Sequence, residues 1–142
     1  MTEAAAYPTL LIRNEHSGCI WWGQQDGTGF ITLGNYPYNH KCAFFIVEPH
    51  GGHHYLRNHF SKFYVHGDDN GTGWIREEKT FNENCQLVAF EAVGPHWRIR
   101  NVHSHYYVHG DNDGTGSLRY DKTKNDNCQL FDFYTPTNPA TA

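Results

Sequence analysis

The side chains best suited to recognise a ligand lie in a segment that the chain contains twice. Residues 63–75 read FYVHGDDNGTGWI, and residues 106–118 read YYVHGDNDGTGSL. Each segment places an imidazole, a glycine and a carboxylate next to one another. A carboxylate accepts hydrogen bonds from two hydroxyl groups at once, an imidazole donates or accepts one, and a glycine lets a ligand approach the backbone. This combination is suited to a ligand that carries several hydroxyl groups.

Amide and amine groups follow each segment in the same register. Residues 79–84 read KTFNEN and residues 122–127 read KTKNDN. An amide offers both a hydrogen-bond donor and an acceptor, and lysine adds a cationic donor. The predicted ligand-binding residues are His66, Gly67, Asp68, Lys79, Asn82 and Asn84 in one segment, and His109, Gly110, Asp111, Lys122, Asn125 and Asn127 in the other.

The strand pattern predicts where the two imidazoles lie. Side chains alternate between the two faces of a strand, so Tyr64 and His66 share one face, as do Tyr107 and His109. Each histidine also comes directly before a turn sequence. We therefore expect both imidazoles to be exposed at the ends of their strands and to contact the ligand.

A third copy of the pattern shows that the chain is built from three repeats. Arg-Asn opens each copy, and Gly-Thr-Gly follows in register. The copies begin 44 and 43 positions apart, at Arg13, Arg57 and Arg100. A cysteine recurs downstream at intervals of 43, at Cys42, Cys85 and Cys128. Internal periods of this length are typical of folds assembled from one supersecondary unit.

The elements that position these residues are short strands. Each repeat has four apolar segments separated by turn residues, and no segment shows a sustained helical period. Three such units predict an all-β fold of twelve strands with almost no helix. The closed arrangement for three units is the β-trefoil, a six-stranded barrel capped by three hairpins with pseudo-threefold symmetry. We expect one β-trefoil domain over residues 1–142, with repeats at about 8–50, 51–94 and 95–138.

On these residues the chain resembles the β-trefoil lectins of the ricin B-chain-like group. Their signature near the end of each repeat is Gln-any-Trp, and the matching residues 43–45, 86–88 and 129–131 read AFF, QLV and QLF. The glutamine is kept twice and the tryptophan never. The Tyr-Val-His-Gly segments resemble the His-Pro-Lys-Gly-Gly segment of the galactose-binding β-trefoil lectins of marine bivalves. The resemblance implies a lectin whose partners are glycans ending in galactose or N-acetylgalactosamine.

The first repeat departs from the other two at the predicted site. It reads Trp22-Gly23-Gln24 where the others read His-Gly-Asp, and of the downstream asparagines it keeps Asn39. These four residues, Trp22, Gly23, Gln24 and Asn39, form at most a degenerate third site.

The same departure suggests an interface between two copies of the chain. Trp21 and Trp22 are neighbours in a strand and point to opposite faces, so they cannot both face the core. An apolar surface patch is typical of an interface, and a patch used by both copies gives a twofold dimer. We therefore expect a homodimer joined through repeat one, with Ile20, Trp22 and Phe30 in the interface.

Other recurring residues are explained by folding alone. Glycines in Gly-Thr-Gly supply the positive φ angles of tight turns. Asn14, Asn58 and Asn101 are expected to bond local backbone at a strand end. The three symmetric cysteines begin apolar segments and are expected to be buried, reduced thiols.

Composition excludes several classes of partner. The chain has 142 residues with a formal net charge of −4 and no cluster of lysine and arginine, which argues against binding to nucleic acid. The first eight residues are too short and too polar for a secretory signal. We therefore expect either a cytoplasmic protein or release by a non-classical route.

Two other functions of trefoil proteins stay open. The eleven histidines fit a histidine-rich trefoil that binds actin or a membrane surface, as the hisactophilin-like trefoils do, whereas the acidic balance favours the lectin. A trefoil protease inhibitor would present one loop unlike its symmetric mates, yet the loop lengths here are nearly equal. No catalytic constellation stands out, and the histidine runs do not match a tetrahedral metal site. We expect no enzymatic activity, no metal and no cofactor.

Overall fold

The structure is a computed structural model that describes residues 8–24, 29–38, 40–68, 70–81, 83–111, 113–123 and 126–135. The first and last strands of each repeat form a closed barrel. In chain order these strands are β1 (Thr9–Asn14), β5 (Phe44–His50), β6 (His53–Asn58), β10 (Val88–Val93), β11 (His96–Asn101) and β15 (Phe131–Tyr134). Each pairs with the next in antiparallel fashion, and β15 pairs with β1 to close the ring. The predicted all-β trefoil with its six-stranded barrel is therefore confirmed.

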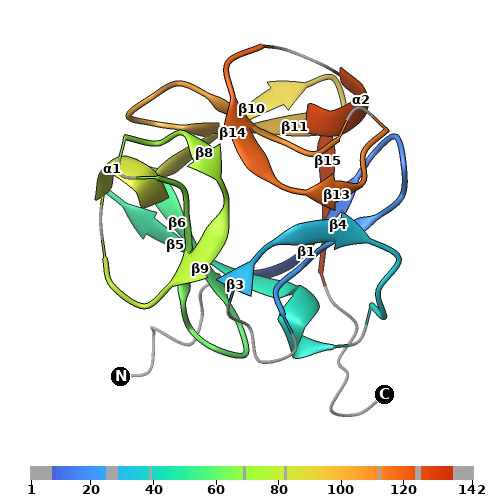
Figure 1. The fold of residues 1–142 in the computed structure, drawn as a ribbon, viewed down its shortest axis with the longest axis horizontal. Helices are drawn as coiled ribbons and strands as arrows, with labels where there is room; N and C mark the ends of the chain where they lie inside the picture. Colours follow the sequence, from blue (N-terminus) through green and yellow to red (C-terminus); the bar gives the residue numbers. More distant parts are fainter. Residues whose placement is uncertain are drawn as a thin grey trace.

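The second and third strands of each repeat form a hairpin over one end of the barrel. The second strands are β2 (Ile20–Trp22), β7 (Tyr64–His66) and β12 (Tyr107–His109). Each third strand is broken in two, giving β3 (Gly29–Phe30) and β4 (Thr32–Gly34), β8 (Gly73–Trp74) and β9 (Arg76–Glu78), and β13 (Gly116–Ser117) and β14 (Arg119–Asp121). In Figure 1 these third strands surround the middle of the molecule.

One buried residue interrupts each third strand and joins the three hairpins. Ile31, Ile75 and Leu118 are completely buried. Their backbone groups form a ring in which Ile31 donates to Ile75, Ile75 to Leu118 and Leu118 to Ile31, at 3.1, 2.9 and 3.0 Å. The half-strand before the break pairs with the neighbouring repeat, and the half after it pairs with its own second strand. Each hairpin is therefore built from two repeats.

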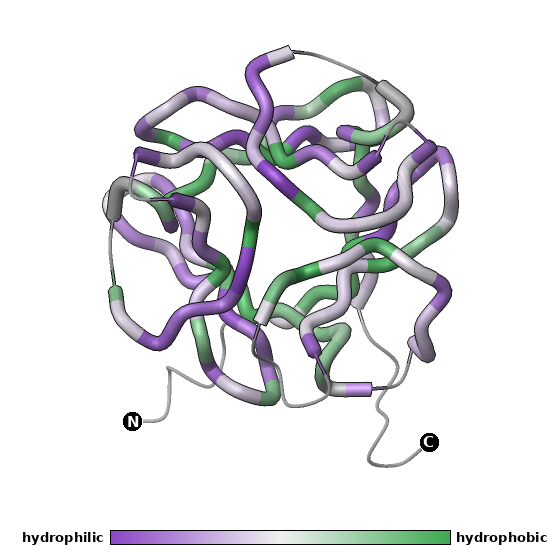
Figure 2. The backbone as a smooth tube through the Cα atoms, in the orientation of Figure 1, coloured by the Kyte–Doolittle hydropathy of each residue, from purple (hydrophilic) through white to green (hydrophobic). Residues whose placement is uncertain are grey.

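The core lies inside the barrel and beneath the hairpins. Trp21 is completely buried and packs edge-on against Phe45 and Phe131, with ring centroids 5.6 and 5.7 Å apart. Figure 2 shows hydrophobic stretches interspersed with hydrophilic ones along the whole described chain. All four cysteines are free and buried, which confirms the predicted burial of the three symmetric thiols.

A single helical turn precedes the last strand of each repeat and was not predicted. The turns are a 3-10 turn (Lys41–Ala43), α1 (Glu83–Gln86) and α2 (Asp126–Gln129). Each contains the recurring cysteine, whose side chain points into the protein. In the part of the chain that is described, no helix has the length and apolar character needed to cross a membrane.

The recurring asparagines and glycines hold neighbouring repeats together. The side-chain oxygen of Asn101 accepts hydrogen bonds from the backbone of His103 and Ser104 at 2.9 and 2.8 Å. The hydroxyl of Ser104 then donates to the carbonyl of Gly71 in the preceding repeat at 2.5 Å. Asn14 and Asn58 bond the local backbone in the same way, which confirms their predicted role.

Candidate functional site

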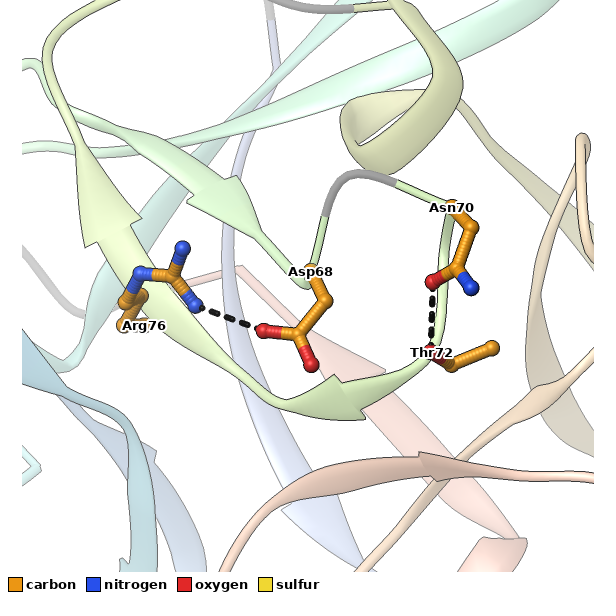
Figure 3. A pocket seen from close by; sticks show the side chains of 4 residues that line it. All are labelled: Asp68, Asn70, Thr72 and Arg76. Atoms are coloured by element: carbon orange, nitrogen blue, oxygen red, sulfur yellow. Dashed lines mark hydrogen bonds and ion pairs between the residues drawn. The ribbon is translucent and has the colours of Figure 1, made fainter.

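Polar side chains surround an open hollow at the hairpin of the second repeat. Asp68, Asn70, Thr72 and Arg76 line this hollow of about 480 Å³. The guanidinium of Arg76 points toward the carboxylate of Asp68, and the amide of Asn70 lies beside the hydroxyl of Thr72 (Figure 3). The hollow therefore brings together a carboxylate, a guanidinium, an amide and a hydroxyl.

A tight loop fixes the carboxylate of this hollow. The backbone nitrogen of Asp68 donates to the carbonyl of Thr72 at 2.7 Å, and Gly71 donates back to the carbonyl of Asp68 at 2.8 Å. The loop can close because Gly71 adopts a φ of 80°. The Thr72 hydroxyl donates to the Asn70 side-chain oxygen at 2.5 Å, so the amide nitrogen is the group that can donate to a ligand.

The arginine is held between two carboxylates. Nη1 of Arg76 lies 3.3 Å from Oδ1 of Asp68, and its Nε lies 3.1 Å from Oε2 of Glu78. Partial burial lowers the pKa of Arg76, but the hydrogen bonds that it donates to Glu78 and Asp68 outweigh the burial and raise that pKa overall. The guanidinium is therefore permanently charged and oriented, while Asp68 is exposed and has acceptor capacity for ligand hydroxyls.

The third repeat has the same arrangement with small differences. Asp111 takes the place of Asp68, and its Oδ1 lies 3.6 Å from Nη1 of Arg119. Nε of Arg119 lies 3.6 Å from Oδ2 of Asp121. Thr115 donates its hydroxyl to Asp113 at 2.6 Å, so a carboxylate stands where the second repeat has an amide. Two hydrogen bonds from Thr123 are the main cause that lowers the pKa of Asp121.

The predicted exposure of the two histidines is wrong. His66 and His109 expose only 5% and 3% of their surface. The helical turns α1 and α2, absent from the strand-based prediction, cover the strand ends where these side chains lie. Sγ of Cys85 lies 3.4 Å from Nε2 of His66, and Sγ of Cys128 lies 3.4 Å from Nε2 of His109. Neither imidazole forms the surface of the hollow.

Each buried imidazole instead anchors a loop. The side-chain nitrogen of Gln86 donates to Nδ1 of His66 at 2.8 Å and to the carbonyl of Thr80 at 2.7 Å. Because an amide nitrogen only donates, Nδ1 accepts and the imidazole is neutral with its proton on Nε2. Gln129 makes the same two bonds, to His109 at 2.8 Å and to the carbonyl of Thr123. The glutamines of the ricin-like signature thus serve the fold.

The glycines next to these histidines also have a packing role. A Cβ on Gly67 would lie 2.6 Å from the ring of Tyr120, and one on Gly110 would lie 2.7 Å from the side chain of Leu33. Both partners belong to the next repeat around the threefold axis. Close contact between repeats is therefore one reason for these glycines, and their contact with a ligand stays a prediction.

The other predicted residues are only partly placed. Lys79 and Lys122 are exposed, and each directly precedes the threonine whose carbonyl accepts from the glutamine. Asn82 and Asn125 lie outside the described residues. Asn84 and Asn127 lie in the helical turns, and the structure describes their backbone alone. Sequence reasoning missed Arg76 and Arg119, although both recur in register three positions after Gly-Thr-Gly, a signal that was available.

In the first repeat an aromatic cluster surrounds Trp22, the residue equivalent to the two histidines. The ring of Trp22 stacks on Tyr36 at 4.5 Å between centroids and contacts His40 at 4.9 Å. Gln24 is exposed, Gly23 is buried, and Asn39 lies outside the described residues. Ile20 is completely buried beneath this cluster, so its predicted place in a dimer interface is wrong.

The burial of His109 makes its imidazole harder to protonate. Burial, followed by the charge of Arg119, lowers the pKa of His109 below its ordinary value of 6.5. Among the residues that the structure describes, no three histidine, cysteine or acidic side chains come together as a metal site.

Comparison with solved structures identifies the fold. The hemolytic lectin CEL-III superposes with a TM-score of 0.78 at 17% identity over 88% of this chain. SeviL bound to the asialo-GM1 saccharide gives 0.71 at 11% identity over 91%, and an endo-β-galactosidase from Clostridium perfringens gives 0.77 at 21% identity over 92%. The chain spans 29% of CEL-III, 98% of SeviL and 32% of the galactosidase. No protein-family model and no curated protein matches the sequence. These likenesses show the β-trefoil fold.

Proposed function

We propose that the protein is a carbohydrate-binding lectin that uses the hollow of repeat two and the equivalent surface of repeat three, which we call the repeat-three hollow. The observation that carries this proposal is the exposed carboxylate of Asp68 beside the fixed guanidinium of Arg76. Together with Asn70 and Thr72 they offer donors and acceptors to several hydroxyls of one sugar. Fold neighbours with lectin activity support the proposal, as does the recurrence of this group in repeat three.

The expected ligands are glycans that end in galactose or N-acetylgalactosamine, and the protein is not expected to catalyse a reaction. The sugar class follows from the sequence resemblance to bivalve trefoil lectins. One fold neighbour is an endo-β-galactosidase, of which this chain spans 32%. A shared fold does not imply a shared activity, so this likeness is compatible with a protein that binds a sugar and does not catalyse a reaction.

A glycan array with two variants tests the proposal. Thr32 occupies the arginine position in repeat one, so Arg76→Thr with Arg119→Thr converts both hollows to the repeat-one residue. We expect wild-type protein to bind galactose-terminated glycans and the double variant to lose this binding at an unchanged melting temperature. His103→Ala, at an exposed position that is not among the residues lining the repeat-two hollow, is the control. An array without any hit for wild-type protein would reject the lectin and favour a search for actin or membrane binding.

We further propose that two copies associate through the aromatic cluster of repeat one. Phe60 is half exposed and lies 6.4 Å from the ring of His40, which joins it to Trp22 and Tyr36, and Tyr38 is half exposed nearby in sequence. Exposed aromatic side chains are enriched in interfaces. A dimer would carry four hollows and could cross-link cells.

Light scattering of wild-type protein and of Phe60→Asp tests the dimer. We expect a wild-type dimer and a variant monomer that binds soluble saccharide normally but loses haemagglutination. A wild-type monomer at tens of micromolar would reject the dimer and leave the lectin proposal intact.

A further inference from the structure

The three boundaries between hairpins differ in one correlated way. Across them the register pairs Phe30 with Arg76, Trp74 with Arg119, and Ser117 with Thr32. An aromatic ring thus stands opposite an arginine at two boundaries, and both are missing at the third. The aromatic residue comes from one repeat and the arginine from the next.

These rings are exposed beside the hollows. Directly opposed residues in an antiparallel pair project from the same face of the sheet, with Cβ atoms about 5 Å apart. Cζ of Arg119 lies 5.7 Å from the centroid of the Trp74 ring. Trp74 exposes 51% of its surface and Phe30 exposes 49%. The guanidinium of Arg119 lies over the Trp74 ring, and about half of each ring's surface stays open to solvent.

We propose that each hollow is shared between two repeats, with the ring supplying the apolar wall of the sugar site. Trp74 of repeat two completes the hollow of repeat three, and Phe30 of repeat one completes the hollow of repeat two. A pyranose has one face of C–H groups, which packs on an aromatic ring while its hydroxyls bond the charged groups. Asp111 and Arg119 supply those charged groups in repeat three, and Asp68 and Arg76 supply them in repeat two.

The composite site deepens the proposed function and rests on it. It also gives the two hollows different walls, an indole in one and a phenyl ring in the other. The larger ring buries more apolar sugar surface, so the repeat-three hollow should bind the same saccharide more tightly. At the third boundary, between repeats three and one, the corresponding residues are Ser117 and Thr32, which supply neither a ring nor a guanidinium.

Two variants that each keep one hollow intact serve as backgrounds in which to test the assignment. Arg76→Thr leaves the repeat-three hollow alone, and Arg119→Thr leaves the repeat-two hollow alone. Calorimetry with lactose then compares Trp74→Ala with Phe30→Ser in each background. We expect Trp74→Ala to lower affinity on the order of tenfold in the first background and to exceed the effect of Phe30→Ser. In the second background the order should reverse.

Two further variants separate stacking from support of the arginine. Trp74→Phe keeps a ring and should restore most of the affinity in the first background, whereas Trp74→Leu keeps apolar bulk and should not. Ser117→Ala is the matched control at the third boundary. Equal effects of Trp74→Ala and Phe30→Ser in both backgrounds, or full affinity with Trp74→Leu, would overturn the composite site. Wild-type protein that binds no saccharide on the array or in calorimetry would overturn the proposed function, and this inference with it.

Discussion

Repeat one and repeats two and three fill the same position in different ways. Trp22, His66 and His109 occupy equivalent positions in the three repeats. Each pairs across its hairpin with a residue that differs between repeat one and the other two. These partners are Thr32, Arg76 and Arg119, respectively. In repeats two and three an imidazole is buried and bonded to a glutamine. In repeat one a tryptophan stacks on its neighbours at the surface, and Ala43 stands where the glutamine would be.

The comparison separates three tasks within the His-Gly-Asp segment. The histidine anchors the loop that follows, the glycine admits a side chain from the next repeat, and the aspartate alone reaches the hollow. Repeat one keeps the glycine and has lost the other two. Packing between repeats is therefore needed at all three positions, whereas the histidine anchor and the aspartate occur in repeats two and three alone.

The largest expected effect concerns the two anchors. His66→Ala or His109→Ala removes a buried ring and takes away one of the two acceptors of the Gln86 or Gln129 amide. We expect each variant to lower the free energy of unfolding by about 2–3 kcal/mol, measured by urea denaturation. The exposed His103→Ala should change it by less than about 0.5 kcal/mol. Wild-type stability in both anchor variants would mean that the histidines are not structural.

A smaller effect is expected on ligand affinity. Asp68→Asn with Asp111→Asn removes the charged acceptors from both hollows while keeping the side-chain shape. Binding of a galactose-terminated saccharide should weaken by about 1–3 kcal/mol, the usual range for a lost charged hydrogen bond. Gln24→Ala, at the equivalent position of repeat one, should leave affinity unchanged in calorimetry. A loss with Gln24→Ala as large as that of the aspartate pair would show that repeat one also binds.

The fold could be predicted because its signals are local and repeated. Three copies of the same turn residues and apolar segments set the period, and closure of three units leaves few alternatives. The break in each third strand was not predicted, because Ile31 and its equivalents look like ordinary strand residues. Their role comes from a ring of backbone bonds across the threefold axis, which no single repeat contains.

The site could be predicted only in part. Asp68 and Asp111 were identified from residue type, and the structure places both beside an arginine. The histidines were misplaced because alternation along a strand says nothing about what covers its end. Here the covering element is a four-residue helical turn, too short to produce a helical period in the sequence. The rings of Phe30 and Trp74 could not be assigned, because their partners lie in another repeat.

The smallest expected effect is a response to acid that distinguishes the repeats. Burial lowers the pKa of His109 below its ordinary 6.5, so the folded protein holds this proton less tightly than the unfolded chain. Between the two pKa values the unfolded chain binds more protons, and stability falls as the pH drops below 6.5. Above 6.5 the imidazole is neutral in both states and the contribution is complete. Protonated Nδ1 cannot accept from Gln129, so the turn α2 should loosen first.

Amide exchange can detect this loosening, because each repeat carries the same reporter bond. The backbone nitrogen of Gly110 donates to the carbonyl of Cys128 at 3.2 Å, and Gly23 donates to Cys42 at 3.0 Å in repeat one. The first bond joins strand β12 to the turn that His109 anchors. Repeat one has Trp22 at that position, but Nδ1 of His40 accepts from the backbone nitrogen of Cys42 at 3.0 Å, so the comparison is made in the His40→Ala variant, which removes this imidazole. Exchange measured by NMR at pH 7.5 and 5.5, corrected for intrinsic rates, should show a loss of protection at Gly110 relative to Gly23. Equal changes at the two glycines would mean that acid acts on the whole fold, and that the buried imidazole does not govern its own loop.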